Sequence, residues 1–265
     1  MHQVRAKKNL GQHFLKDPEI ANEIATALEP EGRYKDVLEI GPGMGILTGF
    51  LFSREDIRCK ALDIDDESIE YLRNHFPFRQ NDIIHDDFLK ADLSKLFPAQ
   101  FAIIGNFPYN ISSQILFKVL DYRDRIPEVV GMFQKEVAER IAGNPGSRDY
   151  GILSVFMQAW YDVKLIMQLN ENDFSPPPKV KSAVLRFERK ENFKLPCDEK
   201  LFRTVVKAAF NQRRKTLRNA MTSVVGKENA DKIPFSGLRA EALTWQQFTE
   251  LTNFVAALKT SGGEQ

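Results

Sequence analysis

A glycine-rich turn between an expected strand and an expected helix constrains the fold more than any other part of this sequence. Residues 36–40 are largely apolar and predict a buried strand, Gly-Pro-Gly-Met-Gly occupies residues 41–45, and apolar residues then recur at helical spacing through residues 46–51. Glycine is needed where the backbone turns tightly against a ligand, because a side chain would fill that space. The pattern alone is weakly specific, but its place between a strand and a helix predicts a ligand-binding turn of an α/β sheet.

Strands and helices alternate through the first part of the chain. Amphipathic helical patterns separate most of the apolar segments, and this alternation predicts a mainly parallel sheet covered by helices. The sequence therefore predicts a seven-stranded α/β domain over residues 1–189. Its strands are expected at residues 36–40, 58–62, 81–85, 101–104, 128–133, 163–169 and 183–187.

The character of the sequence changes at about Lys190. Helical periodicity continues while strand patterns become rare, so we expect a small all-α domain over residues 190–265. These residues contain 13 Lys and Arg against 8 Asp and Glu, a net charge of +5, whereas residues 1–189 contain 24 against 28, a net charge of −4. Segregated charge of this kind indicates a polyanionic partner for the C-terminal part.

Several classes of protein are disfavoured by the sequence. Cys59 and Cys197 are far apart and belong to no Cys/His ligand pattern, so we expect neither a disulfide framework nor a metal site. No run of about 18 apolar residues occurs, and no apolar segment follows the basic N-terminus. We therefore expect no membrane contact, no secretion and a cytoplasmic location.

Three acidic residues lie in or just after expected strands. Asp63 follows the second strand about 20 residues after the glycines, where a doubly wound fold places a carboxylate against a ribose. Asp87 follows the third strand, where an acid would meet the amine of an adenine, and Glu39 lies two residues before the glycine turn. These positions fit a nucleoside-containing cofactor, either a dinucleotide or S-adenosylmethionine. The spacing GxGxG with an adjacent acid favours a ligand that carries an ammonium and a sulfonium, because dinucleotide folds usually have GxGxxG beneath the pyrophosphate.

The tetrapeptide Asn106-Phe107-Pro108-Tyr109 follows the fourth expected strand. Ligands of open α/β sheets bind at the carboxyl ends of the strands, so these side chains would face a ligand. A turn without a functional role is the alternative, since Asn and Pro are common turn formers. With the glycine turn and the acids, the sequence resembles Rossmann-like methyltransferases, and the tetrapeptide resembles the motif of enzymes that methylate exocyclic amines.

A narrower resemblance extends over nearly the whole chain. Six motifs, in order, resemble the small-subunit ribosomal RNA adenine dimethyltransferases, the kasugamycin-resistance family. They are Gly11 to Leu15, Glu39 to Gly43, Asn106 to Ser112, Gln134 to Arg140, Phe174 to Val180 and Phe210 to Leu217. The resemblance implies an S-adenosylmethionine-dependent enzyme with no metal. Such an enzyme dimethylates the N6 amines of two adjacent adenosines in the 3′-terminal hairpin of small-subunit (16S) ribosomal RNA, within an immature 30S particle. We expect it to be a monomer.

The resemblance also assigns roles to residues. The predicted cofactor-binding residues are His13, Leu15, Glu39, Gly41, Gly43, Asp63, Asp87 and Asn106. His13 often corresponds to Asn in the family and Asp63 to Glu, and the shorter Asp63 must approach the ribose more closely.

The predicted catalytic residues are Asn106, Pro108, Tyr109 and Phe174. An adenine amine is a poor nucleophile because its lone pair is delocalised into the ring. The Asn106 side-chain oxygen and the Pro108 carbonyl would accept its two hydrogens, and Tyr109 and Phe174 would hold the base between them.

Basic residues near both ends of the chain are the predicted RNA contacts. They are Arg5, Lys7, Lys8, Arg213, Arg214, Lys215 and Arg218. If residues 211–218 are helical, Arg214 and Arg218 share one face of that helix. A solvated face or internal ion pairs are the alternative to contact with RNA phosphates.

Two other functions are weighed against this one. The first is a non-catalytic RNA-binding assembly factor with the same fold, which the intact glycine turn and Asn106 disfavour. The second is the large-subunit (23S) adenine dimethyltransferase of macrolide resistance, which residues 211–217 disfavour.

Overall fold

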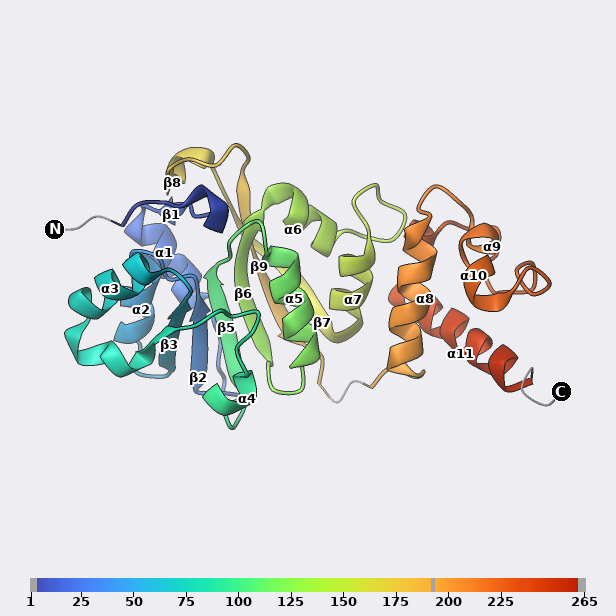
Figure 1. Ribbon diagram of the computed structural model, residues 1–265, viewed down its shortest axis with the longest axis horizontal. Coiled ribbons are helices and arrows are strands. Elements are labelled where there is room, and N and C mark those ends of the chain that lie inside the picture. The colour runs from blue at the N-terminus through green and yellow to red at the C-terminus, as the bar shows by residue number, and fades with distance from the viewer. Residues whose placement is uncertain (1–3, 192–193, 262–265) are drawn as a thin grey trace. The chain divides into compact units, whose positions relative to one another are not determined.

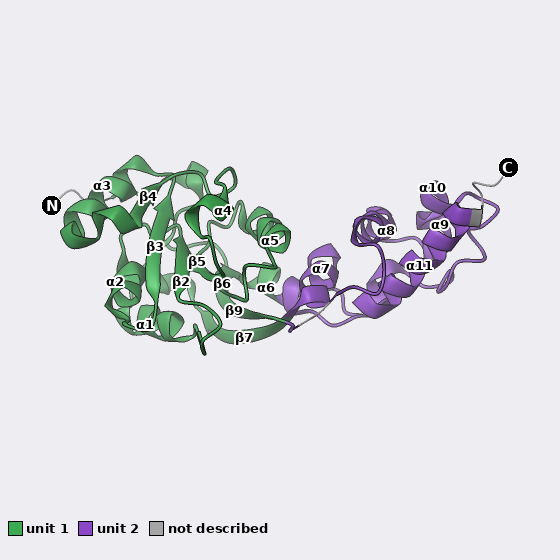
Figure 2. Cartoon of the chain, turned by 90° about the horizontal axis from the view of Figure 1, so that it is seen from below, with its two compact units in different colours: residues 1–138, 162–189 green, residues 139–161, 190–265 purple. Residues whose placement is uncertain are grey.

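The computed structural model describes residues 4–191 and 194–261, and the chain divides into two compact units. Residues 1–138 and 162–189 form unit 1, and residues 139–161 and 190–265 form unit 2 (Figure 2). The sequence-based division at Lys190 differs from these units, because the segment 139–161 makes most of its contacts with C-terminal helices. The division of the chain into two domains with one boundary at Lys190 therefore stays a prediction.

The elements follow one another as the alternating pattern predicts (Figure 1). The strands are β1 (Phe14–Leu15), β2 (Asp36–Ile40), β3 (Arg58–Asp63), β4 (Ile83–His85), β5 (Phe101–Asn106), β6 (Glu128–Gln134), β7 (Tyr161–Leu169), β8 (Phe174–Ser175) and β9 (Ser182–Arg189). The helices are α1 (Pro18–Thr26), α2 (Ile46–Ser53), α3 (Asp66–His75), α4 (Leu93–Leu96), α5 (Ser112–Asp121), α6 (Lys135–Ala142), α7 (Ile152–Trp160), α8 (Glu199–Asn211), α9 (Leu217–Ala220), α10 (Thr222–Val225) and α11 (Trp245–Ser261).

Unit 1 is built on a seven-stranded sheet with the order β4-β3-β2-β5-β6-β9-β7, which confirms the predicted α/β class. Strands β4, β3, β2, β5 and β6 are parallel neighbours, and β9 runs antiparallel to β6. The chain moves outward from β2 to β4 and then returns to place β5 on the other side of β2. A ligand crevice therefore opens at the carboxyl ends of β2 and β5, where the strand order reverses.

Helices cover both faces of this sheet, with α1 and α2 on one side and α5 on the other (Figure 2). Apolar side chains of α1 and α2 pack against alternate residues of the strands, and together they form one buried cluster. Its members include Ala21, Ile24, Leu47, Leu51, Val37, Cys59, Ala102, Ile104 and Val130. Burial on both faces explains why the strands are continuous apolar segments rather than alternating ones.

Gly105 allows β2 and β5 to lie close together next to the crevice. A Cβ atom on Gly105 would lie 2.4 Å from the backbone oxygen of Ile40, and real Cβ atoms do not approach so closely. The obstacle is backbone rather than the end of a flexible side chain, so it cannot move aside cheaply. This glycine therefore fixes the position at which Asn106 leaves the sheet.

A buried ion cluster closes the opposite edge of the sheet. Glu128, the first residue of β6, has a fully buried side chain that accepts a hydrogen bond of 2.6 Å from the Tyr34 hydroxyl. One of its oxygens lies 2.7 Å from Nε of Arg186 on β9, and the carboxylate also accepts from the backbone N–H of Glu29. The cluster ties three segments together, and removing one partner leaves the others buried without compensation.

A second, two-stranded sheet holds the N-terminal segment against unit 1. In it β1 pairs antiparallel with β8, so that Leu15 lies opposite Phe174. The sequence did not predict these strands, because two residues are too few to establish a period of hydrophobicity.

Residues 194–261 are helical, as predicted, and α8 packs on α11 with the rings of Phe210 and Phe248 5.8 Å apart. Residues 211–218 do not form one helix, so the condition for Arg214 and Arg218 to share a helical face is not met. Helix α8 ends at Asn211, Gln212 adopts φ −120° and ψ 57°, and α9 begins only at Leu217. Among the described residues, no helix is long and apolar enough to span a bilayer.

Candidate active site

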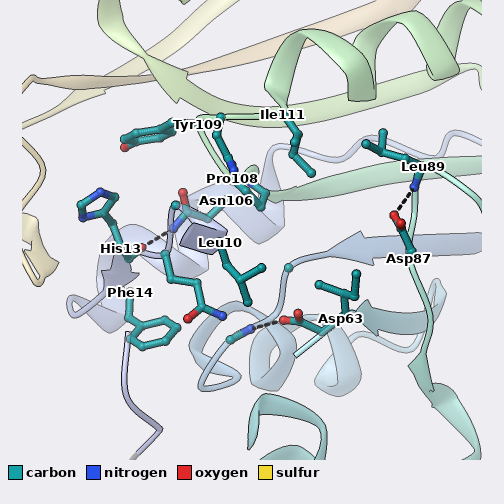
Figure 3. Close-up of a pocket in the computed structure, with 16 residues that line it drawn as sticks. Leu10, His13, Phe14, Asp63, Asp87, Leu89, Asn106, Pro108, Tyr109 and Ile111 are labelled. Atoms are coloured by element: carbon teal, nitrogen blue, oxygen red, sulfur yellow. Dashed lines mark hydrogen bonds between the residues drawn. The ribbon is translucent and has the colours of Figure 1, made fainter. Parts of the chain in front are cut away.

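A pocket of about 210 Å³ opens at the carboxyl ends of β2, β3, β4 and β5 (Figure 3). It is the crevice that the strand order predicts, and the N-terminal segment forms one of its walls. The lining residues are Leu10, Gly11, Gln12, His13, Phe14, Gly41, Gly43, Asp63, Ile64, Asp87, Leu89, Asn106, Pro108, Tyr109, Asn110 and Ile111. The structure thus brings together most of the residues that the sequence assigned to cofactor and amine.

The glycine turn forms the floor of the pocket. Gly41 and Gly43 have φ values of 68° and 54°, in the left-handed region that residues with a side chain rarely adopt. A Cβ on Gly43 would lie 2.7 Å from the Phe14 ring. The turn therefore needs glycine both for its conformation and for the close approach of the N-terminal segment.

Asp63 ends β3 beside this turn, and its carboxylate is held by two backbone donors. Gly43 N donates to Oδ2 at 3.4 Å, and Asp65 N donates to Oδ1 at 3.0 Å. Burial raises the pKa of Asp63 above its ordinary value. A carboxylate fixed in this way is preorganised to accept hydroxyl hydrogens of a ligand.

Asp87 lies at the far end of the pocket, where Leu89 N donates to its Oδ1 at 2.9 Å (Figure 3). Apolar side chains to which the sequence assigned no role also line the pocket. They are Leu10, Phe14, Ile64, Leu89 and Ile111. Ile64 is 50% exposed in the described structure, an unusual state for a large apolar side chain beside a pocket. Such a surface is suited to the flat face of a nucleobase. The position of Ile64 directly after Asp63 was the signal that could have identified it.

Glu39 occupies a smaller cavity that adjoins the pocket and shares Phe14, Gly41 and Asn106 with it. Its side chain is 1% exposed, and Oε2 has no hydrogen-bond partner among the described residues. Burial, with Asp63 nearby, raises the pKa of Glu39 to about 8. Leu15 lines the same cavity. An unsatisfied buried carboxyl group is costly, which indicates that a cationic or donor group of a ligand belongs there.

Asn106 lies at the end of β5, and its carboxamide has a defined orientation. Nδ2 donates to the backbone oxygen of His13 at 2.7 Å (Figure 3), so Oδ1 is the end left to accept a hydrogen bond from a ligand. The Pro108 carbonyl accepts from Ile111 N at 3.1 Å and retains a second lone pair. Asn106 and Pro108 both line the pocket, and each retains an acceptor.

Tyr109 lies at the edge of the pocket, and the His13 ring stacks on it at 5.5 Å between centroids. The Tyr109 hydroxyl shares a hydrogen bond with Ser182, the first residue of β9. Phe174 is not brought to the pocket: its side chain is 1% exposed and packs in the core with Leu15. The structure thus does not bring the Phe174 ring to the pocket, and its stacking role stays a prediction.

The predicted RNA contacts differ in their surroundings. Lys7 lies in ion pairs with Asp65 and Glu67, the latter at 3.2 Å, so its charge is already compensated. Arg213 pairs with Glu241 at 3.2 Å and donates to the carbonyl oxygens of Arg148 and Tyr150. Both residues therefore form ion pairs within the protein, and their contact with RNA stays a prediction.

The remaining predicted RNA contacts are solvent-exposed. Arg218 pairs with Asp231 at 2.8 Å, but both side chains remain more than half exposed. Arg5, Lys8, Arg214 and Lys215 are exposed as well. No group of three or more His, Cys, Asp or Glu that could hold a metal ion occurs within residues 4–191 and 194–261.

The strand order, the glycine turn and the acids at adjacent strand ends define a Rossmann-like nucleoside-cofactor methyltransferase fold. The structure is similar to a dimethyladenosine transferase from Plasmodium falciparum, with a TM-score of 0.76 and 25% identity over 93% of this chain and 98% of that one. It is also similar in fold to the 23S rRNA methyltransferase ErmE, with a TM-score of 0.69 and 24% identity over 92% of this chain and 99% of that one.

The sequence comparisons identify the family. A model described as "Ribosomal RNA adenine dimethylase" matches residues 3–257, and the chain belongs to that family. A relative called ribosomal RNA small subunit methyltransferase A, from Cytophaga hutchinsonii, is 57% identical over 256 residues, which cover 97% of this chain and 99% of the relative.

Proposed function

We propose that this enzyme transfers methyl groups from S-adenosylmethionine to the N6 amines of two adjacent adenosines in the 3′-terminal hairpin of small-subunit ribosomal RNA. The observation that supports the amine substrate best is the pair of acceptors at the end of β5, Asn106 Oδ1 and the Pro108 carbonyl, beside a pocket for a nucleoside. The choice of the small subunit rests on the name of the relative from Cytophaga hutchinsonii.

The pocket fits the proposed cofactor residue by residue. Asp63, held by two backbone donors, would accept the ribose hydroxyls, and Asp87 would accept a hydrogen from the adenine amine. Ile64 and Leu89 would cover the adenine faces. The cofactor supplies an electrophilic methyl on a sulfonium when it is bound.

Glu39 and the glycine turn would hold the methionine end of the cofactor. The Glu39 carboxyl, whose Oε2 has no partner among the described residues, is suited to an ammonium group, and Gly41 lines the same cavity. From the N-terminal segment, Leu15 lines the cavity of Glu39 and His13 lines the adjoining pocket.

The acceptors at the end of β5 would prepare the amine for transfer. When Asn106 Oδ1 and the Pro108 carbonyl accept its two hydrogens, the nitrogen becomes tetrahedral and its lone pair is released from the ring. Positioning and hydrogen bonding then supply the rate enhancement, and the side chains need not include a strong base. Tyr109, with the His13 ring beside it, offers the aromatic surface on which the target base would stack.

Contact with RNA is proposed for the exposed cations, above all Arg214 and Lys215 in unit 2 and Arg5 and Lys8 in unit 1. Their phosphate contacts would weaken as salt rises. We propose an immature 30S particle as the substrate, a monomeric enzyme and a cytoplasmic location.

Labelled S-adenosylmethionine tests this proposal when the protein is incubated with immature small subunits, large subunits or duplex DNA and the modified adenines are mapped. We expect label on two adjacent adenosines of the small subunit. Label on large-subunit RNA alone would show that the large subunit is the substrate and refute the proposal. Binding to small subunits without any label would favour the non-catalytic assembly factor. Asn106→Ala should lower the transfer rate at least about a hundredfold while small-subunit binding persists; near-normal transfer would refute the role of Asn106.

A further inference from the structure

The N-terminal segment from Lys7 to Leu15, here called the strap, crosses the pocket and is fastened at several points. Its distal end is β1, which pairs with β8. In its middle, Asn110 Nδ2 donates to the Asn9 oxygen at 3.2 Å. Between these anchors the His13 oxygen receives the hydrogen bond from Asn106. The strap thus supplies a backbone acceptor to a side chain at the proposed reaction centre.

The proximal end of the strap is fastened to Asp65, two residues beyond Asp63. Asp65 is 3% exposed, and its carboxylate accepts from Gln12 Nε2 and from Ser68 Oγ, each at 3.0 Å, in addition to the ion pair with Lys7. Gln12 also closes the strap on itself, because its Oε1 accepts from Lys7 N at 2.8 Å. A buried carboxylate with three side-chain donors is a well-determined anchor.

The hydrogen bond between the strap and Asn106 decides which end of the carboxamide faces the pocket. A carboxamide has an acceptor at one end and two donors at the other, and rotation by 180° exchanges them. With Nδ2 held by the His13 oxygen, Oδ1 faces the place of the amine. Without the strap in position, the NH2 group can rotate toward the pocket, where it would meet the hydrogens of another amine.

We propose that Asp65 and Gln12 are positioning residues for methyl transfer: they hold the strap so that the His13 carbonyl fixes Asn106 with Oδ1 toward the substrate amine. This proposal rests on the proposed function, because it takes Asn106 as the acceptor of an adenine amine. Neither residue needs to touch the reacting atoms for this role. Asp65 acts on Asn106 through the strap: Gln12 donates to Asp65, and the backbone oxygen of the next residue, His13, accepts from Asn106.

A pair of isosteric variants tests the anchor. Gln12→Glu places two carboxylates about 3 Å apart and should release the strap, since like charges at that distance repel strongly. Asp65→Asn in the same chain restores a donor opposite the new carboxylate, which also offers Lys7 an anionic partner. We expect Gln12→Glu to lower kcat on small subunits by on the order of tenfold to a hundredfold with KM changed much less, and the double variant to recover most of the loss. Asp66→Asn is the matched control, because Asp66 is 88% exposed and faces away from the strap toward His85.

A second measurement reports on the strap without turnover. The side-chain NH2 protons of Asn106 should exchange slowly in the wild type, rapidly in Gln12→Glu and slowly again in the double variant, as followed by NMR on protein labelled at Asn. Thermal unfolding of each variant separates local release from loss of the fold.

Either of two results would overturn the proposal: slow exchange and unchanged kcat in Gln12→Glu, or a double variant that recovers neither property. A wild-type protein that fails to methylate small subunits would remove the proposed function, while the exchange data would still decide whether Asp65 and Gln12 orient Asn106.

Discussion

Glu39 gives the most discriminating prediction about cofactor binding. Its carboxyl group is buried without a hydrogen-bond partner for Oε2, and its pKa is raised to about 8. In the protein without cofactor the group is therefore mostly protonated at neutral pH. A cation placed beside it would stabilise the ionised form and lower this pKa, so that binding expels a proton.

The size of this effect follows from the raised pKa. At pH 7 a group with a pKa of about 8 is about 90% protonated, so binding should release about 0.9 proton into the buffer. Between pH 6 and 7 the dissociation constant for S-adenosylmethionine should fall by about tenfold, because the ionised carboxyl becomes tenfold more abundant. Glu39→Gln should bind more weakly, release almost no proton and lose this dependence on pH.

Isothermal titration calorimetry in phosphate and in Tris measures the proton release, because the two buffers absorb protons with different enthalpies. Glu55→Gln is the matched control, since Glu55 is exposed. A wild-type binding enthalpy that is the same in both buffers would refute the reasoning. Equal proton release from wild type and Glu39→Gln would do so as well, because the proton would then come from another group.

Stability should change with pH in the corresponding direction. The folded-state pKa of Glu39 lies above its unfolded value, so the folded state binds more protons between pH 4.5 and about 8. The contribution of Glu39 to stability is therefore fully present below pH 4.5 and is lost as pH rises through about 8. Without cofactor, Glu39→Gln should lose less stability than the wild type as pH rises from 5 to 8.

Three further predictions concern stability and RNA binding. Gly105→Ala should lower the free energy of unfolding by on the order of 2 kcal/mol, because its Cβ would collide with backbone. Gly49 lies inside α2, and a Cβ there would meet only the Phe76 ring, 3.8 Å away. Gly49→Ala should therefore raise the free energy of unfolding by about 1 kcal/mol. Urea denaturation measures both, and similar effects at the two glycines would contradict the packing argument. Glu128→Gln should cost on the order of 3 kcal/mol in the same assay, because buried Arg186 loses one of its two carboxylate partners and keeps only Glu29. An unchanged unfolding midpoint would show that Glu29 alone compensates Arg186. Arg214→Glu should weaken small-subunit binding most at low salt without changing stability, whereas Arg213→Glu should also lower the unfolding midpoint; equal behaviour of the two would contradict their different surroundings.

The sheet and most of the pocket could be predicted from the sequence because their signals are local. A buried strand, a glycine turn and a helix occur within residues 36–53, and Asp63 and Asn106 directly end their strands. In a parallel sheet the carboxyl ends of neighbouring strands meet at one edge, so residues distant in sequence are brought together by topology alone. Ile64 belongs to the same edge, and its position directly after Asp63 was the only local signal for it, because exposure of an apolar side chain cannot be read from sequence.

The partners of individual side chains could not be predicted in the same way, because they depend on tertiary contacts. Lys7 and Arg214 are both cations near other cations in the sequence, yet one faces Asp65 and the other solvent. Which charges are compensated depends on partners far along the chain, and net charge does not reveal them. The burial of Phe174 was not predictable for a related reason, because β8 pairs with β1 and a two-residue strand has no recognisable pattern in sequence.

The orientation of the Asn106 carboxamide could not be predicted from the type of side chain alone. A sequence can show that a carboxamide follows a strand, but its function here depends on which of its two ends faces the ligand. That choice is made by the backbone oxygen of residue 13, an atom that every amino acid at that position would supply. Substitution of His13 therefore leaves the acceptor in place, and the path of the strap, set by Gln12 and Asp65, determines whether it reaches Asn106. At this site Gln12 and Asp65, which do not contact the amine, would determine whether Asn106 presents its acceptor oxygen or its donor NH2 group to it.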